Sequence, residues 1–262
     1  MAHRLLMCPP QHYHAPGALR QWERFVELLR VAADVKIELV DPAPQAPDLV
    51  FTAIAALVSG DLAIVATPEE SSQRIARKVY RGTLARLGFA TTFLDGASFA
   101  GSADALFDRV RPIVYVGYGP RSDRIVTLQL GEFLTVRIVP LGLADSHFPH
   151  LDTVLCPLRS GHVLAYMPAL NPHAQRLLRR TVEPEYLIEV SSADAMRYAC
   201  NAVELDDALV VHETSRVLRD RLLAAGYRVF STDLSDFVRQ GGGAKRLTLR
   251  LDDGPAVAGA AA

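Results

Sequence analysis

A run of three glycines near the end of the chain leads to Arg246 and an alternating stretch behind it. Gly241-Gly242-Gly243 is followed by Ala244-Lys245-Arg246 and then by Leu247 to Leu251. Glycine permits positive φ and a close approach of other groups, so a glycine turn before a strand can present a functional side chain. The planar, permanently charged guanidinium suits carboxylates and phosphates. Arg246 is predicted to hold an anion, or alternatively to fill a pocket by pairing with a carboxylate such as Asp104.

His150 is the second residue whose type could do chemistry, in Pro149-His150-Leu151-Asp152-Thr153. Histidine exchanges a proton near neutral pH, so His150 is predicted to be a catalytic acid/base. A structural histidine at the start of a strand is the alternative. His147 and Asp152 lie close in sequence, but their spacing fits no established metal site, and we expect no metal and no cofactor.

Arg121 follows Gly117-Tyr118-Gly119, a loop that can present an anion-binding group. It is predicted to bind a ligand carboxylate, with an ordinary surface arginine as the alternative. The three cysteines, Cys8, Cys156 and Cys200, form an odd count without metal-ligand spacing and sit in apolar segments. We expect them to be buried, reduced thiols.

The composition is that of a globular protein without a strongly charged partner. The chain has 262 residues, of which 50% are hydrophobic and 22% charged, and its formal net charge is −1. Near neutrality favours neither nucleic acid nor an anionic membrane, and no apolar run approaches the roughly 20 residues that cross a bilayer. We expect a cytoplasmic protein that binds no nucleic acid and no membrane. Its apolar content permits a homodimer without requiring one.

The elements that must position these residues repeat along the chain. Hydrophobic patterns and glycine turns predict a unit of two strands, a helix and a third strand, recurring at a spacing of roughly 50 residues. The predicted units are strands 49–57, 62–66 and 89–94 with helix 69–87; strands 104–110, 113–116 and 136–141 with helix 123–134; strands 152–157, 163–167 and 186–190 with helix 171–180; and strands 199–204, 208–212 and 228–232 with helix 215–225.

A fifth unit is divided between the two ends of the chain. The last strand, 245–251, lacks partners after it, and the missing strand, helix and strand are found at 4–8, 17–32 and 35–40. The sequence thus predicts one α/β domain over residues 1–251, a closed five-bladed propeller of ββαβ units in which the terminal strands share a blade. The first strand of each unit is expected at the ring axis. Residues 252–262 are predicted to be a flexible tail.

Seven short stretches fall in order on these units and carry a resemblance. They are Met7-Cys8-Pro9-Pro10, Asp48-Leu49-Val50-Phe51-Thr52-Ala53, Asp104-Ala105-Leu106, Gly117-Tyr118-Gly119-Pro120-Arg121, His150-Leu151-Asp152-Thr153, Cys200-Asn201-Ala202-Val203, and Gly241 to Leu251. Together they resemble the guanidino-group-modifying (pentein) superfamily, which includes dimethylarginine dimethylaminohydrolases, arginine deiminases and amidinotransferases. The resemblance covers nearly the whole chain and is closest to dimethylargininase-like bacterial proteins.

The resemblance implies a chemistry in which a cysteine thiolate attacks the guanidinium carbon and a histidine transfers protons. Carboxylates grip the guanidinium through paired hydrogen bonds. On this resemblance the histidine matches His150 and an arginine that holds a substrate carboxylate matches Arg121. Two aspartates of the family pattern match Asp48 and Asp104, although the glycine before the second is Ala103 here.

Three positions depart from the family pattern. The nucleophilic cysteine matches Arg246, the catalytic glutamate matches Ala100, and the residue that binds the guanidinium matches Ile54. These departures remove a nucleophile and two polar groups, and the charge of Arg246 is expected to repel a cationic substrate.

From these departures we expect the resemblance to transfer the fold but not thiol-based guanidine hydrolysis. The leading expectation is a repurposed enzyme that binds a small amino-acid-derived or anionic substrate at the axis, with His150 as acid/base and Arg246, Arg121, Asp104 and Asp48 around the substrate. Such an enzyme would be a non-covalent hydrolase, lyase or cyclase. The alternative is a pseudoenzyme that acts as a binding or partner protein. Guanidine hydrolysis through another residue is a third hypothesis.

Overall fold

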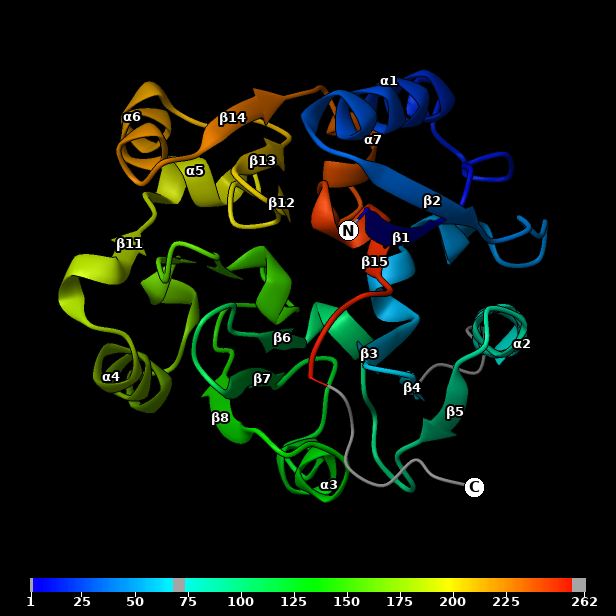
Figure 1. Ribbon diagram of the computed structural model, residues 1–262, viewed down its shortest axis with the longest axis horizontal. Helices are drawn as coiled ribbons and strands as arrows, with labels where there is room; N and C mark the ends of the chain where they lie inside the picture. Colours follow the sequence, from blue (N-terminus) through cyan, green and yellow to red (C-terminus); the bar gives the residue numbers. More distant parts are fainter. Residues whose placement is uncertain (1, 68–73, 256–262) are drawn as a thin grey trace.

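Five small sheets form a closed ring with helices around the outside (Figure 1). This computed structural model describes residues 2–67 and 74–255 of the chain. Each sheet has three strands. The strands, blade by blade, are β3 (Ala56–Ser59), β4 (Leu62–Val65) and β5 (Ala90–Phe93); β6 (Ala105–Phe107), β7 (Ile113–Tyr118) and β8 (Arg137–Gly142); β9 (Leu155–Pro157), β10 (Val163–Ala165) and β11 (Leu187–Glu189); β12 (Val203–Leu205), β13 (Ala208–Val211) and β14 (Arg228–Ser231); and β15 (Leu249–Arg250), β1 (His3–Met7) and β2 (Val35–Leu39).

All five blades share one pairing pattern. The first strand runs antiparallel to the second, as Leu106 opposite Tyr115 shows in β6 and β7, and the second runs parallel to the third. In the last blade β15 pairs antiparallel with β1, and β1 pairs parallel with β2. The prediction of a five-bladed propeller closed by the two terminal strands is confirmed.

Each blade places a helix between its second and third strands. These helices are α2 (Arg74–Arg86), α3 (Val126–Phe133), α4 (Pro172–Thr181), α6 (Arg216–Ala224) and, in the shared blade, α1 (Ala18–Ala32). Two short helices, α5 (Ser192–Met196) and α7 (Ser235–Val238), lie in connections. The amphipathic pattern explains their packing: α1 buries Trp22, Phe25 and Leu29 against the sheet. Residues 69–73 of the helix predicted at 69–87 lie outside the described residues.

The first strands of the units begin later than the sequence indicated. Short 3₁₀ turns precede them: η1 (Pro47–Val50) and η2 (Thr52–Ile54) before β3, η4 (Gly101–Ala103) before β6, η5 (Leu151–Thr153) before β9 and η8 (Lys245–Leu247) before β15. The strand predicted at 49–57 is therefore wrong over most of its length. Most turn residues are as buried as the strands they precede, so burial continues through both and the sequence pattern does not mark the boundary.

The end of the described chain packs against the ring. Asp252 Oδ1 accepts a hydrogen bond from Arg4 N at 3.2 Å, and Ser59 Oγ donates to the carbonyl of Pro255 at 2.7 Å. Residues 252–255 of the segment predicted to be a tail thus make defined contacts, and the remainder, 256–262, lies outside the described residues. Among the helices described, none has the length and apolar character needed to span a bilayer.

Candidate functional site

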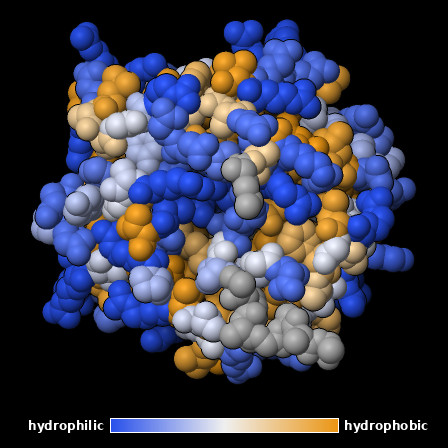
Figure 2. Space-filling model, in the orientation of Figure 1, coloured by the Kyte–Doolittle hydropathy of each residue, from blue (hydrophilic) through white to orange (hydrophobic). Residues whose placement is uncertain are grey.

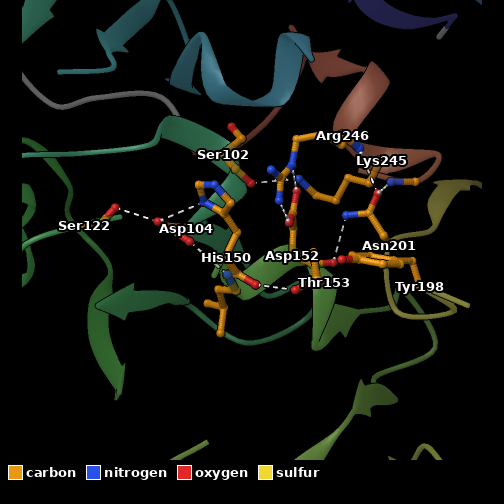
Figure 3. A network of polar contacts seen from close by, with 12 residues as sticks. Ser102, Asp104, Ser122, His150, Asp152, Thr153, Tyr198, Asn201, Lys245 and Arg246 are labelled. Atoms are coloured by element: carbon orange, nitrogen blue, oxygen red, sulfur yellow. Dashed lines mark hydrogen bonds and ion pairs between the residues drawn. The ribbon is translucent and has the colours of Figure 1, made fainter. Parts of the chain in front are cut away.

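The turns that precede the first strands meet at one end of the ring axis. In the structure η2 contacts η4 and η8, and η4 contacts η5. Side chains from separate blades are thereby brought together, although they lie up to about 200 residues apart in the sequence. Figure 3 shows this group, with Arg246 facing Asp152 and His150 facing Asp104.

Arg246 lies at the axis and pairs with Asp152. Its Nε donates to Asp152 Oδ2 at 2.9 Å, and Nη2 donates to Asp152 Oδ1 (Figure 3). Arg246 is 5% exposed and Asp152 is fully buried. Burial acts to lower the pKa of the guanidinium, but Asp152, with a smaller contribution from Asp104, raises it. The carboxylate partner is thus Asp152 rather than the Asp104 suggested by the sequence.

The side chain of Asn201 joins the backbone of the glycine turn and of η8 to the backbone of η5. Its Oδ1 accepts hydrogen bonds from Gly243 N and Arg246 N, both at 3.0 Å, and its Nδ2 donates to the carbonyl of Asp152 at 3.0 Å. Asn201 has no exposed surface. All of its amide contacts are to main-chain groups, so Asn201 fixes the backbone from which the two charged side chains project.

The glycine turn is required by close packing. Gly241 adopts a φ of 86°, in the left-handed region. A Cβ added to Gly242 would lie 2.7 Å from Arg246 Cγ and 2.7 Å from Phe51 Cε1. The absence of a side chain at Gly242 therefore lets the stem of Arg246 fold back over the turn.

His150 faces a carboxylate that is held in place by other groups. His150 Nδ1 lies 3.3 Å from Asp104 Oδ2, which also accepts from Ser122 Oγ at 2.6 Å. Asp104 Oδ1 accepts from Leu151 N at 2.8 Å. Burial acts to raise the pKa of Asp104, but His150, Ser122 and the Leu151 amide together lower it below 3.8. A carboxylate on Nδ1 favours the tautomer that leaves the Nε2 lone pair available.

His150 also keeps access to solvent. Its side chain is 12% exposed, whereas Asp104 is 1% exposed. Nε2 has no hydrogen-bond partner within residues 2–67 and 74–255. His150, Ile54 and Ala100 are all half-buried, so these three positions lie between the closed axis and the surface. Ala100 N donates to Ser122 Oγ at 3.1 Å, which links this position to Asp104.

The other predicted site residues lie farther out. Arg121 is exposed in the connection between β7 and α3, next to the Ser122 that binds Asp104. Asp48 is exposed in η1. The structure therefore groups His150, Asp104 and Arg246 at the axis, whereas Arg121 and Asp48 are exposed in segments that flank the axial turns.

The three cysteines lie in the core of the protein. Cys8, Cys156 and Cys200 are buried, and burial raises the thiol pKa to about 12 for Cys8 and Cys156 and raises that of Cys200 as well. Within the described residues no group of three histidine, cysteine or acidic side chains could hold a metal ion.

Sequence reasoning missed Asp152, Asn201, Ser122 and Tyr198 as site residues. Asp152 and Asn201 lie within stretches that carried the family resemblance, so that signal was present but was assigned to no role. Tyr198 adopts a φ of 56°, which is uncommon for a bulky residue. Burial raises the pKa of its hydroxyl, and Arg246 acts against this. Nothing in the sequence marks this backbone conformation.

Comparison with known proteins identifies the family. The family described as N,N dimethylarginine dimethylhydrolase, eukaryotic, matches residues 10–249, which is most of the chain. The chain belongs to this family. An N(G),N(G)-dimethylarginine dimethylaminohydrolase from Mycobacterium tuberculosis is 30% identical over 238 residues, which cover 89% of this chain and 76% of the relative.

A relative named as bifunctional is also similar to this chain. The bifunctional arginine dihydrolase/ornithine cyclodeaminase ArgZ from Synechocystis sp. is 34% identical over 268 residues, covering 95% of this chain. The chain spans 38% of that relative's length. The N-terminal domain of ArgZ superimposes with a TM-score of 0.92 over 97% of this chain, in one structure with a covalently bound reaction intermediate and in another with substrate. A dimethylarginine dimethylaminohydrolase structure at 19% identity and a TM-score of 0.78 supports the fold alone.

These findings correct the functional expectation. The sequence led us to expect a repurposed enzyme without thiol-based guanidine hydrolysis, or a pseudoenzyme. The expectation of a repurposed or inactive protein is contradicted, because relatives that match nearly the whole chain are arginine dihydrolases whose structures hold substrate, product and a reaction intermediate. The structure also removes one argument behind the expectation. Arg246 was expected to repel a cationic substrate, but the carboxylate of Asp152 neutralises its charge, with Arg246 Nε 2.9 Å from Asp152 Oδ2.

Proposed function

We propose that this chain is a hydrolase that acts on the guanidino group of an arginine-type amino acid at the axial site. The observation that carries the proposal is the contact of His150 with Asp104, in a scaffold that matches a substrate-bound arginine dihydrolase domain along 97% of the chain.

In this proposal His150 transfers protons through Nε2. Asp104 accepts from Nδ1–H and stabilises the imidazolium that forms when Nε2 takes a proton. Ser122 and the Leu151 amide hold the carboxylate of Asp104 so that it faces the imidazole of His150. Because His150, Ser122 and the Leu151 amide lower the pKa of Asp104 despite its burial, it stays ionised at neutral pH and can play this part throughout the reaction.

Water is the reacting nucleophile that the described side chains support. The three thiols are buried and their pKa values are raised, so they are poor nucleophiles in the native state. Water attacks the guanidinium carbon while its proton passes to His150 Nε2. The C–N bond then breaks, and the leaving nitrogen takes that proton from His150. The hydroxyl that water left on the carbon then loses its proton to the released ammonia, which gives a ureido product and ammonium.

The substrate is proposed to lie on the half-buried side of the axis. Ile54 and Ala100 offer an apolar wall beside His150. Arg121 is proposed to bind the carboxylate of the amino acid and Asp48 a positively charged group. Arg246 with Asp152 closes the inner end of the site as a neutral pair, and its guanidinium polarises bound water. A cytoplasmic location and a homodimer belong to this proposal as well.

A product assay tests the proposed function. The full chain is incubated with L-arginine and with N(G),N(G)-dimethyl-L-arginine, and citrulline, ornithine, ammonia and dimethylamine are quantified by mass spectrometry. We expect turnover of at least one substrate. His150→Gln should lower the rate by about 10²–10⁴-fold, since this is the usual contribution of a positioned acid/base.

His173→Gln is the matched control, because His173 is exposed on α4 and distant in the fold from η5. It should retain the wild-type rate. The proposal would be contradicted if neither substrate gave product, or if the His150→Gln and wild-type proteins had equal rates.

A further inference from the structure

The ring has a second polar end, opposite the axial site. The turns that hold His150 and Arg246 precede the first strands of the blades, so the opposite ends of β6, β9 and β15 point away from that site. Figure 1 shows the chain leaving β15 and crossing the ring beside β6. Hydrophilic side chains gather left of centre on the face seen in Figure 2.

A cavity of about 660 Å³ lies at this end, and we call it the far-end cavity. Its basic lining residues are Arg109 and Arg111 after β6, Arg159 after β9, and Arg250 in β15. A smaller cavity of about 30 Å³ continues toward the axis and reaches Lys245 and Glu204. Arg109, Arg250 and Asp253 line both cavities, so the two adjoin, and we call them together the passage.

The carboxylates that line the far-end cavity are already engaged by the protein. Asp108 accepts from two backbone amides, from Arg111 and from Tyr115. Asp253 binds Arg109 Nη1. Asp252 accepts from Arg4 N at 3.2 Å. These three carboxylates are therefore poorly placed to bind a cation from solvent.

Arg250, in contrast, keeps unused donors. A guanidinium has five N–H donors, and within residues 2–67 and 74–255 the acceptor for Arg250 is the carbonyl of Glu204 alone. No carboxylate of these residues lies within ion-pair distance of it. Arg109 Nε also lacks a hydrogen-bond partner, as does Glu204 Oε2, which is 3.8 Å away in a residue that is 4% exposed. The passage thus contains two neighbouring guanidinium groups with donors to spare.

We propose that the far-end cavity binds a small oxyanion, a phosphate or carboxylate group, between Arg250 and Arg109. Guanidinium forks bind both groups in a bidentate manner. An anion there relieves the repulsion between the two guanidinium groups and satisfies donors that the protein leaves open. The volume is in the range of pockets for small metabolites, so the oxyanion can be carried by a larger molecule.

The passage also gives this site a link to the axial site. Lys245 Nζ faces the inner cavity and donates to the carbonyl of Ser102 at 2.8 Å, while the adjacent Arg246 faces Asp152. Both belong to η8, which leads directly into β15 and Arg250. The oxyanion site itself does not depend on turnover at the axial site.

Anion titration of the full chain tests the proposal. Binding of inorganic phosphate and of citrate is measured by isothermal titration calorimetry, with sodium chloride at equal ionic strength as the reference. We expect a Kd below about 1 mM for at least one of them. Phosphate binding alone assigns the site to phosphate groups, and citrate binding alone assigns it to carboxylates.

Two variants locate the anion. Arg250→Gln should weaken binding by about tenfold or more. Arg216→Gln, in an arginine that is 93% exposed on α6, should leave the Kd unchanged. Should Arg250→Gln not fold, Arg159→Gln at the exposed rim of the cavity replaces it, with an expected weakening of about threefold. Wild-type Kd values above about 1 mM for both anions, or undiminished binding by the folded cavity variant, would overturn the proposal.

Discussion

Removal of the carboxylate from Asp152 should strongly destabilise the fold. Asp152→Ala leaves the guanidinium of Arg246 buried at 5% exposure without its counter-charge, and the two hydrogen bonds between the side chains are lost. Breaking a buried pair in this way costs about 3–5 kcal/mol. For a domain of this size the loss corresponds to a fall in Tm of about 6–20 °C. Urea unfolding followed by circular dichroism measures the free energy, and thermal unfolding measures Tm.

An exposed pair of the same geometry is the control. Arg228 Nε and Nη2 donate to the two carboxylate oxygens of Asp207 at 2.8 and 2.7 Å, but the side chains are 51% and 57% exposed. Asp207→Ala should therefore change the stability far less than Asp152→Ala, because solvent screens an exposed ion pair.

A double variant separates unpaired charge from lost packing. Arg246→Met together with Asp152→Ala removes both charges and should be more stable than Asp152→Ala alone, because no uncompensated ion remains. Equal and small losses for Asp152→Ala and Asp207→Ala would refute the reasoning, since they would mean that burial does not set the energy of the axial pair.

Three further predictions follow from other parts of the structure. The pKa of Asp104 is lowered in the native state, so its ionised form stabilises the fold above pH 3.8 and this stability is lost as pH falls below that value; the difference in unfolding free energy between wild type and Asp104→Asn should shrink over the same interval. The three cysteines should resist iodoacetamide in the native protein and all react after unfolding, which mass spectrometry detects. Gly101→Ala should lower Tm, because φ is +60° and a Cβ would lie 2.9 Å from the backbone of Ala56, whereas Gly82→Ala in α2, with open space around it, should stabilise the protein by about 0.5–1 kcal/mol.

The fold was predictable because the hydrophobic pattern repeats with each blade. Turns such as Ser59 to Asp61 and helices such as 18–32 fall close to their predicted places, and the split blade followed from counting the strands. The starts of the axial strands were not predictable. Thr52 and Leu151 lie in buried 3₁₀ turns, where burial on all sides gives the same apolar signal as a strand.

The candidate site was predictable in position but not in its pairing. Sequence motifs directed attention to His150 and Arg246, and both lie at the meeting point of the axial turns. The choice of Asp152 as the partner of Arg246, and of Asp104 as the partner of His150, depends on the way turns from different blades face one another. Contacts between such distant segments leave no periodic pattern in the sequence, and Asn201, which orders these turns, resembles any polar residue in a loop.

The most direct test of the proposed function is to follow the guanidino carbon itself. L-arginine labelled with ¹³C at that carbon is mixed with the purified full chain, and ¹³C NMR spectra are recorded over time beside the His150→Gln variant. We predict that the guanidinium signal decays and a carbonyl-type signal grows with the wild-type protein, while the variant leaves the spectrum nearly unchanged. A guanidinium signal that persists with the wild-type protein, or that decays equally with the variant, would contradict the role given to His150 and the axial site.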